Sequence, residues 1–281
     1  MNDAMKAANK RIVDVIVNIV MLAFSIFCIF PFIWMFYSSF KTEAEFAQNI
    51  IALPKSLQFS NYAKAIQTGK LGFYSINSLF NCIITVTVVV VIAFIAAYFL
   101  SRFSFKGRNL IYGLFMLGML IPVHSLMIPI FMQFKALNFL DTRLTLLPVY
   151  ISFGLPMAIF LMESFIGGIP VDLEEAATID GSSMLRSMFS VIMPLCKPVI
   201  ATVVILTFMG TWNEFPFALI LVKTDALKTI PVGLRNFQGA YTARYAQFMA
   251  GMIVALIPVI IVYALFYKKI IVGMTAGSVK G

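Results

Sequence analysis

The sequence contains little charge, and this shortage excludes most classes of soluble protein. Of its 281 residues, only 12% are Asp, Glu, Lys or Arg, whereas 61% are hydrophobic. Soluble domains carry about 25% charged residues, so the composition indicates an integral membrane protein. The formal net charge of +9 comes from basic residues scattered among loops without a stripe. That distribution fits membrane flanks better than a nucleic-acid surface, so we expect no nucleic-acid partner.

Residue types that perform covalent or metal chemistry are scarce as well. The three cysteines, Cys28, Cys82 and Cys196, lie within or beside apolar runs without metal-ligand spacing, and we expect small core residues there. No G-x-x-x-x-G-K-[ST] phosphate-binding loop, catalytic nucleophile or cofactor fingerprint occurs. The sequence therefore predicts a protein that is not an enzyme, binds no cofactor or metal, and takes its energy from elsewhere.

Long apolar runs dominate what is present. The first run is much longer than a signal-peptide core, so we expect it to stay as a span. Prolines at 122, 129, 148 and 156 predict kinks in the third and fourth spans. The fold class predicted is an all-α polytopic membrane protein, with residues 1–281 forming one transmembrane domain. Its six spans are expected at about 12–40, 73–100, 110–134, 144–165, 199–222 and 248–271.

The orientation of the spans depends on one cluster of basic residues. Arg102, Lys106 and Arg108 follow the second span directly, and such clusters favour the cytoplasmic side. The other basic residues divide almost evenly between the two sides. With the N-terminal head inside, both termini, the 101–109 loop, the 170–198 loop and the 273–281 tail are expected in the cytoplasm; this cluster agrees with that orientation, and the family resemblance described below implies it.

The loop 170–198 is the only long polar stretch with ordered helix signals. Asp172 followed by Glu175 is a capping-box pattern, which predicts a helix that begins near Leu173. Gly181 is placed to end that helix in a left-handed conformation, after Asp180. The loop is therefore expected to begin with a short helix and a tight turn.

A second short helix is expected after this turn. Ser182 or Ser183 can cap it, and an apolar stripe then continues until Pro194. A first helix of two turns is marginal alone, so a partner is expected to receive its alanine face, Ala176 and Ala177, and to pair with the flanking acids. A cytoplasmic loop that only connects two spans is the alternative.

Several motifs make this chain resemble a known family. The loop is similar to the signature loop of bacterial ABC-importer inner-membrane permeases, at the family's spacing, and later motifs resemble the smaller permease subunit of the carbohydrate, maltose-type branch. The residues that carry the resemblance are Glu175-Ala176-Ala177, Asp180-Gly181, Phe189, Ile192, Pro194, Pro198, Trp212-Asn213-Glu214-Phe215, Ile230-Pro231-Val232-Gly233-Leu234 and the terminal segment 273–281.

The resemblance implies a partnership and assigns residues to it. It implies a second homologous permease, two ATP-binding cassette subunits that hold ATP and magnesium, an extracellular or periplasmic sugar-binding protein, and a place in the bacterial plasma (inner) membrane. Coupling to the ATPase is expected at the 170–198 loop, and the tail is expected to face the ATPase. The coupling residues are Glu174, Glu175, Ala176, Ala177, Asp180 and Gly181, and the tail residues are Gly277, Val279 and Lys280.

The cargo is expected to be a carbohydrate, most simply an oligosaccharide. Import of glycerol-phosphate or another polyol by the same architecture is the first alternative. A self-sufficient secondary transporter is a different class of function. Such transporters usually show repeated halves and intramembrane coupling residues, and this sequence has no evident internal repeat.

Trp212, Asn213 and Glu214 are the candidate substrate-path residues, within the fifth predicted span. An acid in the hydrocarbon region costs about 2.5–3.5 kcal/mol, so it should face a cavity or a partner. Aromatic rings, amides and carboxylates are the usual chemistry of sugar sites. A structural role that locks spans together is the alternative. For His124 in the third span, a hydrogen-bonded packing role is favoured over pH sensing.

Overall fold

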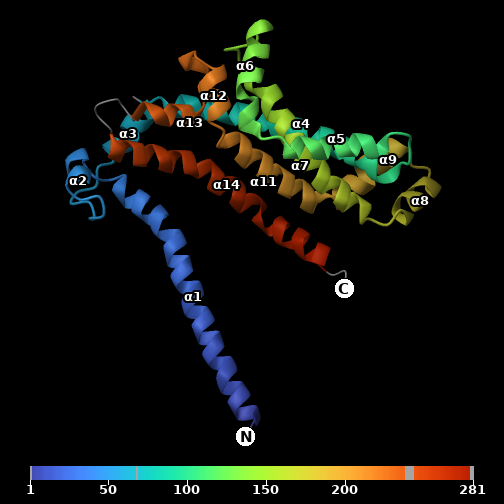
Figure 1. Ribbon diagram of the computed structural model, residues 1–281, viewed down its shortest axis with the longest axis horizontal. Coiled ribbons are helices and arrows are strands. Elements are labelled where there is room, and N and C mark those ends of the chain that lie inside the picture. The colour runs from blue at the N-terminus through green and yellow to red at the C-terminus, as the bar shows by residue number, and fades with distance from the viewer. Residues whose placement is uncertain (1, 68, 238–243, 279–281) are drawn as a thin grey trace. The chain divides into compact units, whose positions relative to one another are not determined.

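The computed structural model describes residues 2–67, 69–237 and 244–278, and within them every regular element is a helix (Figure 1). The all-α prediction is confirmed. The chain falls into two compact units, one of residues 1–69 with 237–254 and the other of residues 70–236 with 255–281.

Four helices are long and apolar enough to cross a membrane by themselves. They are α1 (Asn2–Ser38), α4 (Leu71–Arg102), α7 (Leu146–Gly167) and α14 (Tyr245–Ser278). Two bent helix pairs raise the number of spans to six among the described residues, if each pair is one span. The first, second, fourth and sixth predicted spans therefore overlap single helices, whereas the third and fifth do not.

The third predicted span is broken, not merely kinked. It comprises α5 (Arg108–Leu120), the 3-10 turn η1 (Val123–Leu126) and α6 (Met127–Ala136), with a bend of 92°. Ile121 and Pro122 are both extended at the break. Proline has no N–H to continue the helix and disfavours the helical conformation of the residue before it, which explains the position of the break.

The fifth predicted span also divides. The segment before it forms α9 (Met184–Ser187), a π-helical turn η2 (Met188–Ile192) and α10 (Met193–Leu195), and the chain then bends by 76° into α11 (Lys197–Trp212). A second break follows α11, and α12 (Pro216–Leu221) begins beyond it. The segment predicted as the fifth span, at about 199–222, therefore consists of two helices, α11 and α12, with a break between them.

The core of the second unit is the contact of α4 with α7 and α11. Small residues on α4, among them Ala93 and Ala97, are fully buried and allow the neighbouring helices to approach closely. Ile159 of α7 and Val203 of α11 belong to the same cluster, which continues to Ile192 in η2. Two of the predicted core cysteines, Cys82 and Cys196, are buried, whereas Cys28 is exposed on α1.

In Figure 1, α8 (Asp172–Ile179) and α9 lie at one end of this helix bundle, and α12 and α13 (Ile230–Leu234) lie at the other. The turn η3 (Asp225–Leu227) and the turn η4 (Arg235–Phe237) flank α13. Asp225 anchors this second end, because its carboxylate accepts hydrogen bonds from Tyr74 Oη at 2.8 Å and from Lys70 and Lys228 Nζ at 2.5 and 3.0 Å.

The first unit contains two short helices, α2 (Glu43–Gln48) and α3 (Ser60–Gln67), and the start of α14. Thr42 and Glu45 form a capping box at α2. The carboxylate of Glu43 accepts hydrogen bonds from the backbone N–H groups of Ala246 and Gln247 and thereby caps α14 from another helix.

Candidate functional site

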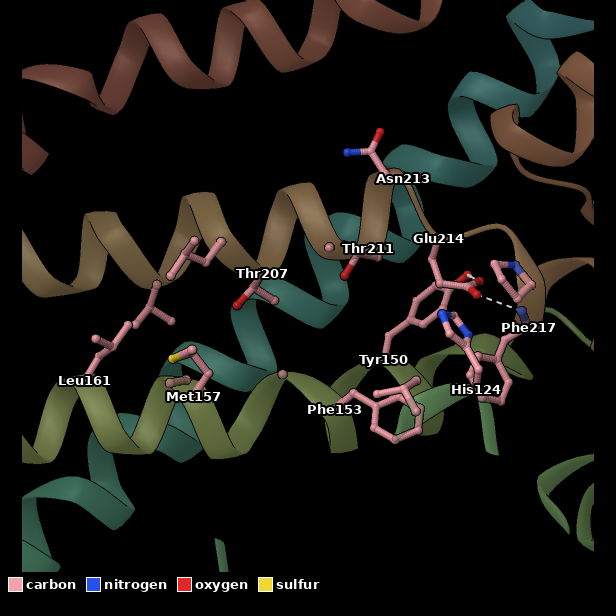
Figure 2. A pocket seen from close by; sticks show the side chains of 17 residues that line it. His124, Tyr150, Phe153, Met157, Leu161, Thr207, Thr211, Asn213, Glu214 and Phe217 are labelled. Carbon is pink, nitrogen blue, oxygen red and sulfur yellow. Dashed lines mark hydrogen bonds between the residues drawn. The ribbon is translucent and has the colours of Figure 1, made fainter. Parts of the chain in front are cut away.

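A cavity of about 410 Å³ lies between α7 and α11. Figure 2 shows Met157 and Leu161 on the side of α7 that faces α11, and Thr207 and Thr211 on the side of α11 that faces α7. Most of the lining is apolar, and the polar side chains are those of His124, Tyr150, Thr207, Thr211, Asn213 and Glu214. An apolar concave site with a few polar groups is the usual form of a small-molecule site.

Glu214 lies at the break between α11 and α12 and forms part of the cavity wall. Its Oε2 accepts hydrogen bonds from Tyr150 Oη at 2.8 Å and from the Ala218 N–H at 3.0 Å, and its Oε1 accepts one from the Phe217 N–H at 2.7 Å. Both oxygens therefore satisfy donors of the chain itself, including the otherwise unpaired N–H groups at the start of α12.

The other two predicted substrate-path residues point elsewhere. Trp212 is 2% exposed, stacks on Phe208 at 5.5 Å and donates a hydrogen bond from Nε1 to the Ala255 carbonyl of α14 at 3.0 Å. Trp212 therefore joins α11 to α14 and does not line this cavity, and its assignment to the substrate path stays a prediction. Asn213 is exposed at the rim, and Figure 2 shows its amide pointing away from Glu214 and Tyr150.

Two threonine side chains, Thr207 and Thr211, also line the cavity, although the sequence did not mark them as candidate substrate-path residues. Among the described residues, neither Thr207 nor Thr211 has a hydrogen-bond partner for its hydroxyl. Phe153 of α7 is the partly buried aromatic ring of the lining. His124 is exposed on η1 and lines the cavity. Its side chain is therefore not packed among the described residues, contrary to the hydrogen-bonded packing role predicted for it. The four-residue spacing of the two threonines was the available signal.

The polar loop forms a helix, a turn and a second helix. Gly181 has φ of +80°, the left-handed conformation that glycine adopts without strain, and Ser183 Oγ accepts a hydrogen bond from the Arg186 N–H. The predicted capping box at Asp172 is wrong. Val171 is the N-cap of α8, and Asp172 is its first residue. The three acids of the first turn, Asp172, Glu174 and Glu175, therefore stabilise the helix through its dipole and do not cap it with their side chains.

The predicted coupling residues differ in their surroundings. Glu175, Ala176 and Asp180 are exposed, and Ala177 is partly buried. Glu174 is only 13% exposed, because its carboxylate binds Arg102 Nε and Tyr98 Oη of α4 at 2.5 and 2.6 Å. The prediction that the flanking acids are free to pair with a partner therefore does not hold for Glu174.

The predicted ATPase-facing tail is described only in part. Gly277 lies in the backbone of α14, which continues to Ser278. Val279 and Lys280 lie outside the described residues.

The comparisons with known proteins agree with one another. Residues 89–274 match the family model described as binding-protein-dependent transport system inner membrane component. The chain is 35% identical to the trehalose/maltose transport system permease protein of Thermococcus litoralis, over 97% of this chain and 98% of that protein. It is also 35% identical to the sulfoquinovosyl glycerol transport system permease protein of Agrobacterium fabrum, over 90% of this chain and 89% of that protein.

A similar fold occurs in a solved structure. The crystal structure of a bacterial ABC transporter involved in the import of the acidic polysaccharide alginate contains a chain that superposes with a TM-score of 0.81. The two chains are 26% identical, and the match covers 92% of this chain and 96% of that one.

Proposed function

We propose, because this chain belongs to the family of binding-protein-dependent transport system inner membrane components, that it forms half of the translocation path of an ATP-driven carbohydrate importer. Membership of this family makes the chain a multi-pass permease subunit of the inner membrane. A second homologous permease supplies the other half of the path in this proposal. The importer class is favoured over an ion-driven secondary transporter for the same reason.

The observation that supports this proposal is the cavity between α7 and α11, whose lining includes two threonine hydroxyls without hydrogen-bond partners among the described residues and the aromatic ring of Phe153. Sugar hydroxyls exchange hydrogen bonds with such groups, and sugar rings stack on aromatic faces. The Glu214 carboxylate is already occupied by three donors of the chain. We therefore assign substrate contact to Phe153, Thr207 and Thr211, and a structural role to Glu214.

In this proposal, α8 contacts the ATPase subunit and transmits the conformational change that ATP hydrolysis drives. Its exposed surface includes Glu175 and Ala176 and the apolar side chain of Ile179, which is 86% exposed. Apolar surface next to acidic groups suits a groove with basic residues on an ATPase subunit. ATP and magnesium bind to two such subunits, the tail residues Val279 and Lys280 face them, and both termini of this chain lie in the cytoplasm.

The charge of the cavity favours an uncharged oligosaccharide as cargo. The lining contains one carboxylate and, among the described residues, no lysine or arginine. An anion brought into a membrane cavity without a cationic partner pays a large desolvation cost. Glycerol-phosphate is therefore the less favoured cargo, although the relatives named above include permeases for both neutral and anionic sugars.

Isosteric variants of the cavity threonines test this assignment. Thr211→Val removes a hydroxyl without changing the volume, so we expect the substrate concentration for half-maximal uptake to rise about 2–10-fold, the value of one hydrogen bond. Thr202→Val is the matched control on the same helix, because the Thr202 hydroxyl already donates to the Pro198 carbonyl at 3.2 Å. The uptake assay uses the whole complex in proteoliposomes with maltose and trehalose.

Two outcomes of this assay would contradict the proposal. One is equal half-maximal concentrations for Thr211→Val, Phe153→Ala and wild type. The other is faster uptake of glycerol-phosphate than of either disaccharide.

A further inference from the structure

The helix α8 has almost no apolar attachment to the rest of the described chain. None of its residues is buried, and Leu173 and Ile179 are 43% and 86% exposed. A helix of eight residues is not stable by itself in water. Apart from its contacts with α9 and η2, its position therefore depends on polar contacts, and one group of these contacts joins it to α4.

That group joins α8 to the last turn of α4. The Arg102 guanidinium donates from Nε to Glu174 Oε1 at 2.5 Å and from Nη2 to the Ile169 carbonyl at 3.0 Å. Tyr98 donates from its hydroxyl to Glu174 Oε2 at 2.6 Å. Arg102 thus holds both α8 and the connection that leads into it, while both carboxylate oxygens of Glu174 are used.

These contacts are well shielded from water. The side chains of Arg102 and Glu174 are 8% and 13% exposed, and Tyr98 is 2% exposed. A shielded ion pair with complete hydrogen bonding has a defined geometry, unlike an exposed pair between mobile side chains. The neighbouring pair between Arg108 and Glu163 is of the exposed kind, with 3.6 Å between Nη2 and Oε1 and side chains 38% and 21% exposed.

We propose that Arg102, Tyr98 and Glu174 form a coupling latch that makes α8 move as one body with α4. The proposal rests on the proposed function, in which an ATPase subunit acts on α8. Because α4 packs along α7 and α11, whose side chains line the cavity, displacement of α8 reaches the cavity walls through α4. Arg102 and Tyr98 are positioning residues, and Glu174 faces its own chain and not the ATPase.

The second half of the loop supports the same assignment. Met188 and Ile192 of η2 are buried in the core cluster with α4, and the ring of Phe189 lies 6.0 Å from the ring of Phe94. The loop is therefore joined to α4 at both ends, by apolar packing after Gly181 and by the latch before it. Without the latch, α8 would be held only by its backbone connections and its contacts with α9 and η2.

The test uses the complex purified with its ATPase subunits and substrate-binding protein. ATP hydrolysis is measured with and without binding protein loaded with maltose or trehalose, and the yield of co-purified ATPase subunits is recorded. For Arg102→Ala we expect an unchanged yield and about a tenfold smaller stimulation by the loaded binding protein. For Tyr98→Phe we expect a two- to threefold smaller stimulation. The reversed pair, Arg102→Glu with Glu174→Arg, should recover part of the stimulation that either single change removes, because it restores the ion pair but not the hydrogen bond to the Ile169 carbonyl.

Glu163→Gln is the matched control, because it removes the charge of the exposed pair at the same end of the bundle while Arg108 keeps its hydrogen bond to the Leu100 carbonyl of α4. Its stimulation should stay within twofold of wild type. The latch is refuted if Arg102→Ala retains normal stimulation, if the reversed pair recovers nothing, or if Arg102→Ala loses the ATPase subunits themselves. A wild-type complex without any ATPase subunit would instead refute the proposed function, so the two failures are distinguishable.

Discussion

Replacement of Glu214 by alanine should destabilise the α11–α12 break. Three donors lose their acceptor in this variant, namely the Tyr150 hydroxyl and the N–H groups of Phe217 and Ala218. All three residues are buried, with exposures of 6%, 1% and 1%. Each unsatisfied buried donor costs about 1–3 kcal/mol. Because water can reach the cavity and α12 can rearrange, we expect a net loss of about 2–4 kcal/mol.

The assay is the apparent melting temperature of the purified complex in detergent. A loss of this size should lower that temperature by about 5–10 °C. Glu163→Gln is the matched control, since this carboxylate near the opposite end of α7 has only a long ion pair with Arg108, which is worth at most about 1 kcal/mol. Its melting temperature should change by only about 1–2 °C.

A double-mutant cycle separates the Tyr150 contact from the capping contacts. Tyr150→Phe and Glu214→Ala should not be additive, because both remove the hydrogen bond from the Tyr150 hydroxyl to the Glu214 carboxylate. Additive effects of these two changes would contradict the geometry, as would a Glu214→Ala complex that melts at the wild-type temperature.

Three further predictions concern the two ends of the bundle. Gly181→Pro should abolish transport while the protein still inserts, because proline cannot adopt φ of +80°; wild-type uptake would remove the coupling role of this turn. Gly233→Ala should cost about 1–3 kcal/mol in thermal unfolding, since its Cβ would lie 2.2 Å from Tyr74 Cδ2, and an unchanged melting temperature would refute that overpacking. Hydrogen bonds from Lys70, Tyr74 and Lys228 lower the pKa of Asp225 below its ordinary 3.8, so this carboxylate adds stability that is constant above about pH 5 and declines as pH falls below about 4. Asp225→Asn should reduce that acid dependence, and an unaltered pH profile would contradict it.

The sequence reading was accurate where function depends on local pattern. Gly181 occupies the turn position expected from residue type, and Ser183, one of the two serines predicted as the cap, caps the second helix, because backbone conformation at such positions is set within a few residues. Hydropathy likewise located four helices that can cross a membrane. The family resemblance also rested on short motifs, such as Glu175-Ala176-Ala177 and Asp180-Gly181, and the family model confirms it.

The errors concern interactions between residues far apart in sequence. Glu174 faces inward because of Tyr98 and Arg102, which precede it by 76 and 72 positions, and no local pattern specifies such a pair. Trp212 and Glu214 are two residues apart, yet one binds α14 and the other caps α12. Hydropathy did not reveal the break between them, because both flanking helices are apolar.

The most direct test of the central claim is ATP hydrolysis by the purified complex in nanodiscs, with oligosaccharide-loaded binding protein added to wild type and to Glu175→Arg. Glu175 is exposed on α8 and has no part in the latch. The account predicts that wild-type hydrolysis rises with the loaded binding protein and that Glu175→Arg loses the associated ATPase subunits. Sugar uptake by this chain alone, driven by an ion gradient and independent of ATP, would contradict it.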